Sequence, residues 1–468
     1  MKKIILFLVI ALFSGCSNTV EPPLIKELKI IGDLEHSLSI HMDDLSEHTI
    51  SDNKHLAISL QDVFENNEIK FEEYNVMFVA NDTLTNLIES DYDEVLVYVK
   101  DNKWHIHSDV FPPTLNLKDV NHLMFIKKQP TADDGVTLFT VSEDKHLITV
   151  GNHMSYGFET VLKLDGVSTK NTQTMHAYQQ KTILPLSKLS DATSFLVFSY
   201  QGDHQYLSND IYLLKKDTNF DVVDEDFNIL VSHVAGILED PPAHSIMDLY
   251  YDSEYYISNN IPIMIILVDG LGYHQFMYAK NNNIAPTITS LEPKIATSVY
   301  TPVTNAGMAA MLSGQSPLNN GVLNRRFRQV KTPTIFDVAK QYNASAVLLE
   351  GNINILDLNV DVRLHLDNNG NGTSDDEIFD SALQRMNDDD VLMIHFHSFD
   401  DAGHSYGPLA SQTMDRLSML DDMISELLKS WQGVSIIVSD HGMHQTSEGG
   451  NHGLISHSDM IVPYFIIP

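Results

Sequence analysis

Seven side chains in the C-terminal part of the chain could together hold metal ions and a nucleophile. They follow predicted strands, precede a predicted helix or lie in the last loop: Asp269, Thr304, Asp400, His404, Asp440, His441 and His452. Carboxylates and imidazoles that follow several strands of one α/β sheet can meet in one site. Three carboxylates and three imidazoles without a thiolate form oxygen- and nitrogen-rich shells, which suit Zn²⁺ best and Mn²⁺ next. The sequence therefore predicts a two-metal site.

Thr304 is the candidate nucleophile. A threonine hydroxyl is a weak nucleophile at its ordinary pKa, so a metal ion would have to hold it as an alkoxide. Residues 305–312 are predicted to form a short helix closed by Gly314, which places Thr304 at a helix N-terminus. The backbone N–H groups and the helix dipole favour a bound phosphate there. Any one Asp or His alone is more simply a helix cap or loop residue, but the ordered set favours a site.

The order of these motifs resembles the alkaline phosphatase superfamily, and within it the type I phosphodiesterase/nucleotide pyrophosphatase branch. The resemblance covers about residues 261–468. It rests on an Asp after a strand, a Thr ahead of a helix that ends in Ser-Gly, and three further motifs: Asp-x-x-Gly-His at 400–404, Asp-His-Gly-Met at 440–443 and His-Gly at 452–453. The resemblance implies one zinc held by Asp269, Thr304, Asp440 and His441, and a second held by Asp400, His404 and His452. His457 competes with His452 for the last position.

One departure from the branch concerns the phosphate-binding group. Nucleotide pyrophosphatases place an Asn after the nucleophile helix, where this chain reads Gly-Val-Leu-Asn-Arg-Arg-Phe-Arg-Gln, so Asn324 or Arg325 would take the role. The branch's Thr-Phe-Pro-Asn run is replaced by Thr304-Asn-Ala-Gly. The resemblance therefore implies metal-dependent phosphate-ester chemistry but leaves nucleotide specificity open.

The implied activity is hydrolysis of a phosphate ester or phosphodiester through a phosphothreonine intermediate. Two alternatives stay open: a phosphomonoesterase or phospho-group transferase of the same superfamily, and a surface ligand-binding lipoprotein that acts through its β-rich half. The sequence does not separate monoesters from diesters.

The N-terminus is predicted to be a signal peptide. Lys2 and Lys3 precede a short apolar run over residues 4–13, and Ser14 and Gly15 then precede Cys16, the sole cysteine. This run is too short to span a bilayer. Cys16 stands where a bacterial lipoprotein signal places its lipid-modified cysteine, which predicts an extracytoplasmic protein anchored to the membrane by lipid. A secretory signal with a chance cysteine is the alternative.

Composition bounds the partners of the protein. The chain has 468 residues, 43% of them hydrophobic, which leaves room for two to three domains. Its 63 acidic and 29 basic residues give a formal net charge of −34. Such an acidic surface argues against binding to nucleic-acid backbones, and solubility outside the cell is its simplest explanation.

The predicted fold is α/β, with an alkaline-phosphatase-like sheet flanked by helices over residues 257–468. Strands are expected at 261–268, 344–349, 391–396 and 434–438, with an amphipathic helix at 411–431. Residues 16–135 and 136–220 are rich in short β-type runs and predict one or two mostly β domains. The acidic, turn-rich stretch 221–256, which contains Asp240-Pro241-Pro242, is predicted to be a linker.

A glycine- and asparagine-rich insertion between residues 367 and 377 partly matches a calcium loop. Oxygen side chains fall at positions 1, 3, 5 and 9 of the template, with Gly372 at position 6: Asp367, Asn369, Asn371 and Asp375. Position 12 is Ile378 in place of the usual Glu, so a plain solvated acidic turn is the favoured interpretation.

Overall fold

The computed structural model describes residues 26–82, 85–208, 210–386 and 388–468. The predicted signal peptide and Cys16 lie outside these ranges. The described residues form two compact units: one comprises the residues up to Ile31 together with Ser37–Phe125, and the other comprises Gly32–His36 and Ile126–Pro468. Within the described ranges, every helix is too short or too polar to span a membrane.

The first unit is mostly β, as predicted. Its sheets have the strand orders β2-β1-β9-β5-β6 and β3-β4-β7-β8. Helix α1 (Leu60–Asn66) begins where the Ser59 hydroxyl accepts a hydrogen bond from the Asp62 N–H, and it buries Phe64 against Phe125. The strands are β1 (Leu28–Gly32), β2 (Leu38–Ile40), β3 (Ser46–Ile50), β4 (Asn53–Ser59), β5 (Tyr74–Ala80), β6 (Thr85–Ile88), β7 (Leu96–Lys100), β8 (Lys103–His107) and β9 (Val120–Lys127).

The second unit begins with two five-stranded sheets around a shared apolar core. Their orders are β11-β10-β19-β14-β15 and β12-β13-β16-β17-β18. The strands are β10 (Gly135–Phe139), β11 (Asp144–Thr149), β12 (Glu159–Lys170), β13 (Gln173–Pro185), β14 (Ser194–Ser199), β15 (His204–Ser208), β16 (Tyr212–Lys215), β17 (Phe220–Val223), β18 (Ile229–Val231) and β19 (Val234–Glu239).

The prediction of a linker at 221–256 is wrong. This stretch contains β18 and β19, and every residue of β19 is buried in the middle of its sheet. Asp224, Glu225 and Asp226 lie in the turn between β17 and β18, and Asp240, Pro241 and Pro242 directly follow β19. One face of this sheet packs through Phe139, Phe198 and Leu238 against Ile455 and Met460 of the α/β part, which explains why residues 126–468 form one unit.

An eight-stranded sheet forms the α/β part and confirms the predicted fold class. Its order is β20-β22-β29-β26-β21-β25-β23-β24, and the strands from β26 to β24 run parallel. The strands are β20 (His244–Ser245), β21 (Ile263–Val268), β22 (Lys294–Thr297), β23 (Ala346–Glu350), β24 (Asp361–Leu364), β25 (Val391–Phe396), β26 (Val434–Val438) and β29 (Ile461–Ile467).

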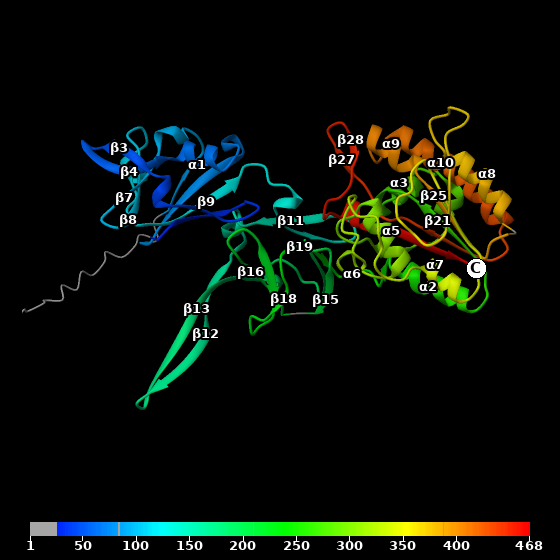
Figure 1. Cartoon of the computed structure of the whole chain (residues 1–468), viewed down its shortest axis with the longest axis horizontal. Coiled ribbons are helices and arrows are strands. Elements are labelled where there is room, and N and C mark those ends of the chain that lie inside the picture. The colour runs from blue at the N-terminus through cyan, green and yellow to red at the C-terminus, as the bar shows by residue number, and fades with distance from the viewer. Residues whose placement is uncertain (1–25, 83–84, 209, 387) are drawn as a thin grey trace, which may run out of the picture. The chain divides into compact units, whose positions relative to one another are not determined.

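Helices cover both faces of this sheet (Figure 1). Ile263, Ile265 and Leu267 of β21 face one helix layer, and the alternate residues Met264 and Ile266 face the other. The first layer contains α2 (Asp248–Ser258), α5 (Thr304–Ser313) and α7 (Ile335–Gln341), and the second contains α3 (Tyr273–Asn281), α8 (Asp375–Arg385) and α10 (Ser411–Ser430). The short helices are α4 (Pro286–Ser290), α6 (Pro317–Asn320), α9 (Ser398–Tyr406) and α11 (His457–Met460).

Helix α10 is the long amphipathic helix predicted from the apolar spacing, and it offers a test of this packing. Leu420 is 1% exposed and its neighbour Met419 is 44% exposed. We expect Leu420→Ala to lower the free energy of unfolding by about 2–5 kcal/mol, because it leaves a cavity under the sheet. Met419→Ala is the matched control and should change it by less than about 0.5 kcal/mol. Urea denaturation measures both, and equal losses would contradict this packing.

Candidate metal centre

The structure brings the first predicted ligand group together. His441 Nε2 lies 3.3 Å from Thr304 Oγ1, 3.4 Å from Asp269 Oδ1 and 3.3 Å from Asp440 Oδ2. Asp269 directly follows β21, and Asp440 and His441 follow β26, which pairs with β21 in parallel. The carboxyl ends of two adjacent parallel strands therefore deliver these side chains to one point.

The second predicted group adjoins the first. Asp400 and His404 stand one turn apart on α9, with His404 Nε2 3.3 Å from Asp400 Oδ2. His452 Nε2 lies 3.9 Å from Asp400 Oδ1, and its ring stacks on His441 at a centroid distance of 3.7 Å. Asp400, His441 and His452 have ligand atoms close enough to share one ion, as do Asp269, Asp440 and His441. The two groups form a single continuous centre.

The three histidines of this centre are held in the tautomer that binds metals. In each ring Nδ1 lies against a backbone carbonyl oxygen: 3.0 Å from Gly442 for His441, 3.1 Å from Gly450 for His404, and 3.0 Å from Pro302 for His452. A carbonyl oxygen only accepts, so Nδ1 carries a proton in each ring and Nε2 is the atom left to bind a metal. Ring orientation by an outer hydrogen bond is typical of metal-ligating histidines.

One oxygen of each aspartate in the centre is buried without a hydrogen-bond donor from the described part of the chain. These atoms are Asp269 Oδ1, Asp400 Oδ1 and Asp440 Oδ2. Burial and the nearby charge of Asp269 raise the pKa of Asp440 to about 7. Buried carboxylates with open lone pairs, crowded together, are stabilised by cations. The donor set therefore fits two divalent ions, with Zn²⁺ favoured by the imidazoles.

Thr304 begins helix α5, as predicted, and Gly314 closes this helix in the left-handed conformation at φ 64°. The helix packs closely against the strand end that carries Asp440. A Cβ atom on Gly307 would lie only 2.8 Å from the Asp440 carbonyl oxygen, so glycine is required at this contact. Because Thr304 is the first residue of α5 and its hydroxyl lies beside His441, the helix N-terminus adjoins the centre, and a helix N-terminus can bind an anion.

Of the two candidate phosphate-binding residues, Arg325 contacts a ligand side chain of the centre, and Asn324 makes a local hydrogen bond. Arg325 Nη2 lies 2.6 Å from His452 Nε2, whereas Asn324 Oδ1 accepts a local hydrogen bond from the Arg326 N–H.

His457, the competing candidate for the last metal-ligand position, lies elsewhere. Its backbone N–H donates to Asp144 and its ring is 3.2 Å from that carboxylate.

The predicted calcium loop is folded on its own hydrogen bonds. The Asp367 carboxylate accepts hydrogen bonds from the backbone N–H groups of Gly370, Asn371 and Gly372. Asn369 donates to Asp376 and, like Asn371, accepts a bond from a backbone N–H two residues on. Asp375 turns inward, and its carboxylate accepts bonds from the backbone N–H groups of His397 and Ser398. Calcium binding stays a prediction, but Asp375 already serves to fix the start of α9.

Three residues near the centre escaped the sequence analysis. His395 and His397 lie beside Asp269 Oδ2, and Glu350 contacts both of these rings. Burial opposes ionisation of Asp269, yet hydrogen bonds from His395 and His397 hold its pKa well below the usual range. A histidine inside the apolar run of β25 was the available clue, because a buried imidazole needs a partner.

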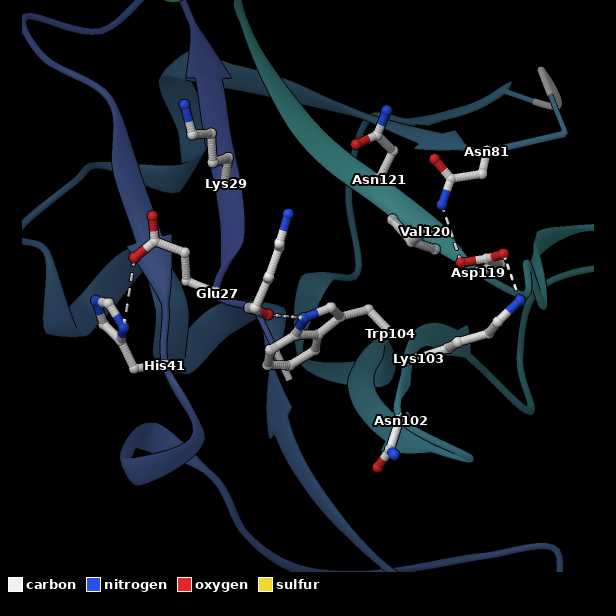
Figure 2. Close-up of a pocket in the computed structure, with 11 residues that line it drawn as sticks. Glu27, Lys29, His41, Asn81, Asn102, Lys103, Trp104, Asp119, Val120 and Asn121 are labelled. Atoms are coloured by element: carbon white, nitrogen blue, oxygen red, sulfur yellow. Dashed lines mark hydrogen bonds and ion pairs between the residues drawn. The ribbon is translucent and has the colours of Figure 1, made fainter. Parts of the chain in front are cut away.

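The first unit contains a separate hollow of about 780 Å³. Figure 2 shows that several lining groups are already paired with one another: Lys103 and Asn81 both donate to Asp119, His41 lies beside Glu27, and the Trp104 indole donates to the Lys26 carbonyl. Ligand binding through the β-rich half stays a prediction.

Comparison with known proteins agrees with the motifs. Residues 339–462 match the family model of the type I phosphodiesterase/nucleotide pyrophosphatase family. The predicted family resemblance is confirmed over this segment. It includes Asp400, His404, Asp440, His441 and His452, while Asp269 and Thr304 precede it. The chain is also similar to GPI ethanolamine phosphate transferase 3 of Saccharomyces cerevisiae, with 36% identity over 90 residues. These cover 19% of this chain and 8% of the yeast protein.

Similar solved structures include phosphonoacetate hydrolase from Sinorhizobium meliloti in complex with phosphonoformate. It shares 14% identity at a TM-score of 0.33, over 39% of this chain and 57% of that chain. Another is inactive murine ectonucleotide pyrophosphatase/phosphodiesterase 5 in complex with AMP. It shares 14% identity at a TM-score of 0.32, over 40% of this chain and 59% of that chain. The chain thus spans less than two thirds of the length of either protein.

The centre predicts two metal ions per chain. We expect Asp440→Asn to lose one ion and His452→Ala to lose the other, because each removes a buried ligand. His457→Ala is the matched control and should keep both ions. Elemental analysis after dialysis against trace zinc measures the stoichiometry. Loss of an ion from His457→Ala, with two retained by His452→Ala, would transfer the last ligand role to His457.

Proposed function

We propose that the protein is a metal-dependent hydrolase of phosphate esters, of the phosphodiesterase/nucleotide pyrophosphatase type, that acts through a phosphothreonine intermediate. The observation that carries this proposal is the position of Thr304. Its hydroxyl lies 3.3 Å from His441 Nε2, at the N-terminus of a helix, in a centre whose buried carboxylate oxygens accept no hydrogen bond from the described residues. The family match of residues 339–462 supports the same class of chemistry.

Each of the two groups of side chains would hold one metal ion. Asp269, Asp440 and His441, with Thr304, would hold one ion, and the side chains of Asp400, His404 and His452 would hold the other. When bound, two such ions supply charge neutralisation for the phosphate and lower the pKa of a hydroxyl or water. The positions of these ligands follow from the fold, since the parallel strands, α5 and α9 fix all but His452.

Thr304 carries the covalent step. Its Oγ1 forms a bond to phosphorus while the bond from phosphorus to the leaving alcohol oxygen breaks, and that oxygen gains a proton. The oxygen of a water molecule then bonds to phosphorus, the bond between phosphorus and Oγ1 breaks, and Oγ1 takes up a proton, so that the Thr304 hydroxyl and phosphate (or a phosphomonoester from a diester) result. The N–H groups at the start of α5 and the Arg325 guanidinium favour the anionic group throughout.

Phospho-group transfer to an alcohol is the second candidate function. The similarity to a yeast ethanolamine phosphate transferase over 90 residues favours it. The two functions differ only in the molecule that attacks the phosphothreonine, which is water in a hydrolase and an alcohol in a transferase. Product analysis in the presence of ethanolamine or glycerol separates them, since a transferase yields the new phosphate ester.

We expect Thr304→Ala to lower turnover of bis-p-nitrophenyl phosphate or p-nitrophenyl phosphate by roughly 1,000-fold or more, because the nucleophile is lost. Its metal content should stay near normal, since six other ligand side chains remain. Thr304→Ser keeps the hydroxyl and is the matched control, with measurable activity expected. Chelator treatment should abolish wild-type turnover and added zinc should restore it. An alanine variant that keeps more than a few per cent of the wild-type rate would exclude the covalent mechanism.

We further propose an extracytoplasmic location, with a lipid anchor at Cys16. The support is the sequence alone: Lys2 and Lys3, a short apolar run, and Ser14-Gly15 ahead of the sole cysteine. Cys16→Ser should prevent lipid attachment and leave either an uncleaved precursor or a soluble protein. Detergent-phase partitioning of the cell fractions measures this. A cleaved Cys16→Ser protein that still enters the detergent phase would mean that another feature holds it to the membrane.

A further inference from the structure

A closed group of four polar side chains lies behind the metal centre. Glu350 ends β23, His395 lies within the neighbouring strand β25, His397 follows that strand, and Asp269 follows β21. Glu350 and His395 are fully buried, and Asp269 is 3% exposed. Burying a carboxylate in the middle of an apolar sheet is unfavourable unless the group makes specific contacts. Apolar packing alone therefore does not explain the burial of Glu350.

The two imidazole rings bridge the two carboxylates. His395 Nδ1 and His397 Nε2 lie 2.8 and 2.7 Å from Glu350 Oε1. The opposite ring atoms face Asp269 Oδ2, with His395 Nε2 at 3.2 Å and His397 Nδ1 at 3.7 Å. The rings lie against each other at a centroid distance of 3.8 Å. One glutamate thus fixes the orientation of both rings, and both rings face the same oxygen of Asp269.

The two oxygens of Asp269 are used differently. Oδ2 receives the contacts from His395 and His397, whereas Oδ1 has no hydrogen-bond donor among the described residues and lies 3.4 Å from His441 Nε2 in the metal centre. Rotation of the carboxylate would exchange these atoms and break the contacts to the rings. The group therefore holds Oδ1 in the direction of the centre.

We propose that Glu350 is a positioning residue for the metal centre, which acts through His395 and His397 to hold the carboxylate of Asp269 in its metal-binding orientation. The inference rests on the proposed function, since it takes Asp269 as a metal ligand. Outer partners of this kind commonly change metal affinity by about 10–100-fold when they are removed. The parallel pairing of β23 with β25 and of β25 with β21 makes the arrangement rigid.

A direct role for the rings as ligands of a third ion is the competing explanation. His395 Nε2 already makes a hydrogen bond to Asp269 Oδ2, and His397 Nε2 makes one to Glu350 Oε1. These bonds favour a hydrogen-bonded support over a further ion. The two explanations predict different metal stoichiometries, because the support requires two ions per wild-type chain and the competing explanation requires three.

The test measures zinc affinity of the full chain by competition with a chromogenic chelator. Glu350→Gln should weaken one of the two zinc sites by about 10–100-fold and leave the other unchanged. Glu239→Gln is the matched control, because Glu239 is also buried, on β19, and is paired with Lys145. It should leave both zinc affinities at the wild-type value, even if both variants lower the melting temperature.

His395 provides a second, independent variant should Glu350→Gln fail to fold. Gln at this position keeps a donor able to reach Asp269, while Leu does not, so His395→Gln should retain more zinc affinity than His395→Leu. Wild-type affinity in Glu350→Gln, or equal losses at both sites, would overturn the positioning role. Three zinc ions in the wild type and two in Glu350→Gln would make the rings ligands. A wild-type chain that binds neither zinc nor manganese would instead overturn the proposed function, and this inference with it.

Discussion

Mutual repulsion among buried carboxylates governs the C-terminal half of this protein. Asp269, Asp400 and Asp440 meet near the carboxyl ends of the central strands. Each has an oxygen that lacks a hydrogen-bond donor from the described part of the chain. In a low-dielectric setting such a cluster is unfavourable unless protons or cations neutralise it, and the pKa of Asp440 rises to about 7 for this reason, since burial and Asp269 both oppose its charge. The surrounding structure keeps the cluster open to cations: backbone carbonyl groups fix three imidazoles so that their lone pairs face it.

Apolar burial in the sheet offsets the unfavourable free energy of this concentration of charge. Strands β26, β21 and β25 are parallel and in register, and their residues are almost entirely apolar and buried on both faces. Their packing stabilises the domain by burial of apolar area, while the strand ends carry the polar groups. The apolar strands are therefore adjacent in the chain to the polar strand ends, but different interactions stabilise the two. The helices add two contributions: α9 supplies Asp400 and His404, and α5 supplies Thr304 together with a helix N-terminus.

Much of this arrangement could be predicted from the chain because strand ends leave a local pattern. An apolar run followed by Asp places Asp269 and Asp440 without any knowledge of the fold, and Gly314 correctly closes the helix after Thr304. The linker prediction was wrong because Asp240-Pro241-Pro242 indicates a turn, and a turn can follow a buried strand as well as connect two domains. Glu350 and His395 were missed since each stands in an apolar strand, and only the pairing of β23 with β25 reveals that they are partners. The contact of Arg325 with His452 spans 127 positions and has no local pattern.

The apolar contact between the β sheet and the α/β part has a consequence for dissecting the protein. Tyr300, Ile455, Met460 and Ile461 are buried against strands β10, β14 and β19. Ile455 follows His452 within the same loop, so the covering strands also support the last candidate ligand. A fragment that starts at residue 257 would expose this surface to water and would tend to self-associate through it. The compact unit that contains this cover comprises Gly32–His36 and Ile126–Pro468, so the two β sheets and the α/β part belong together.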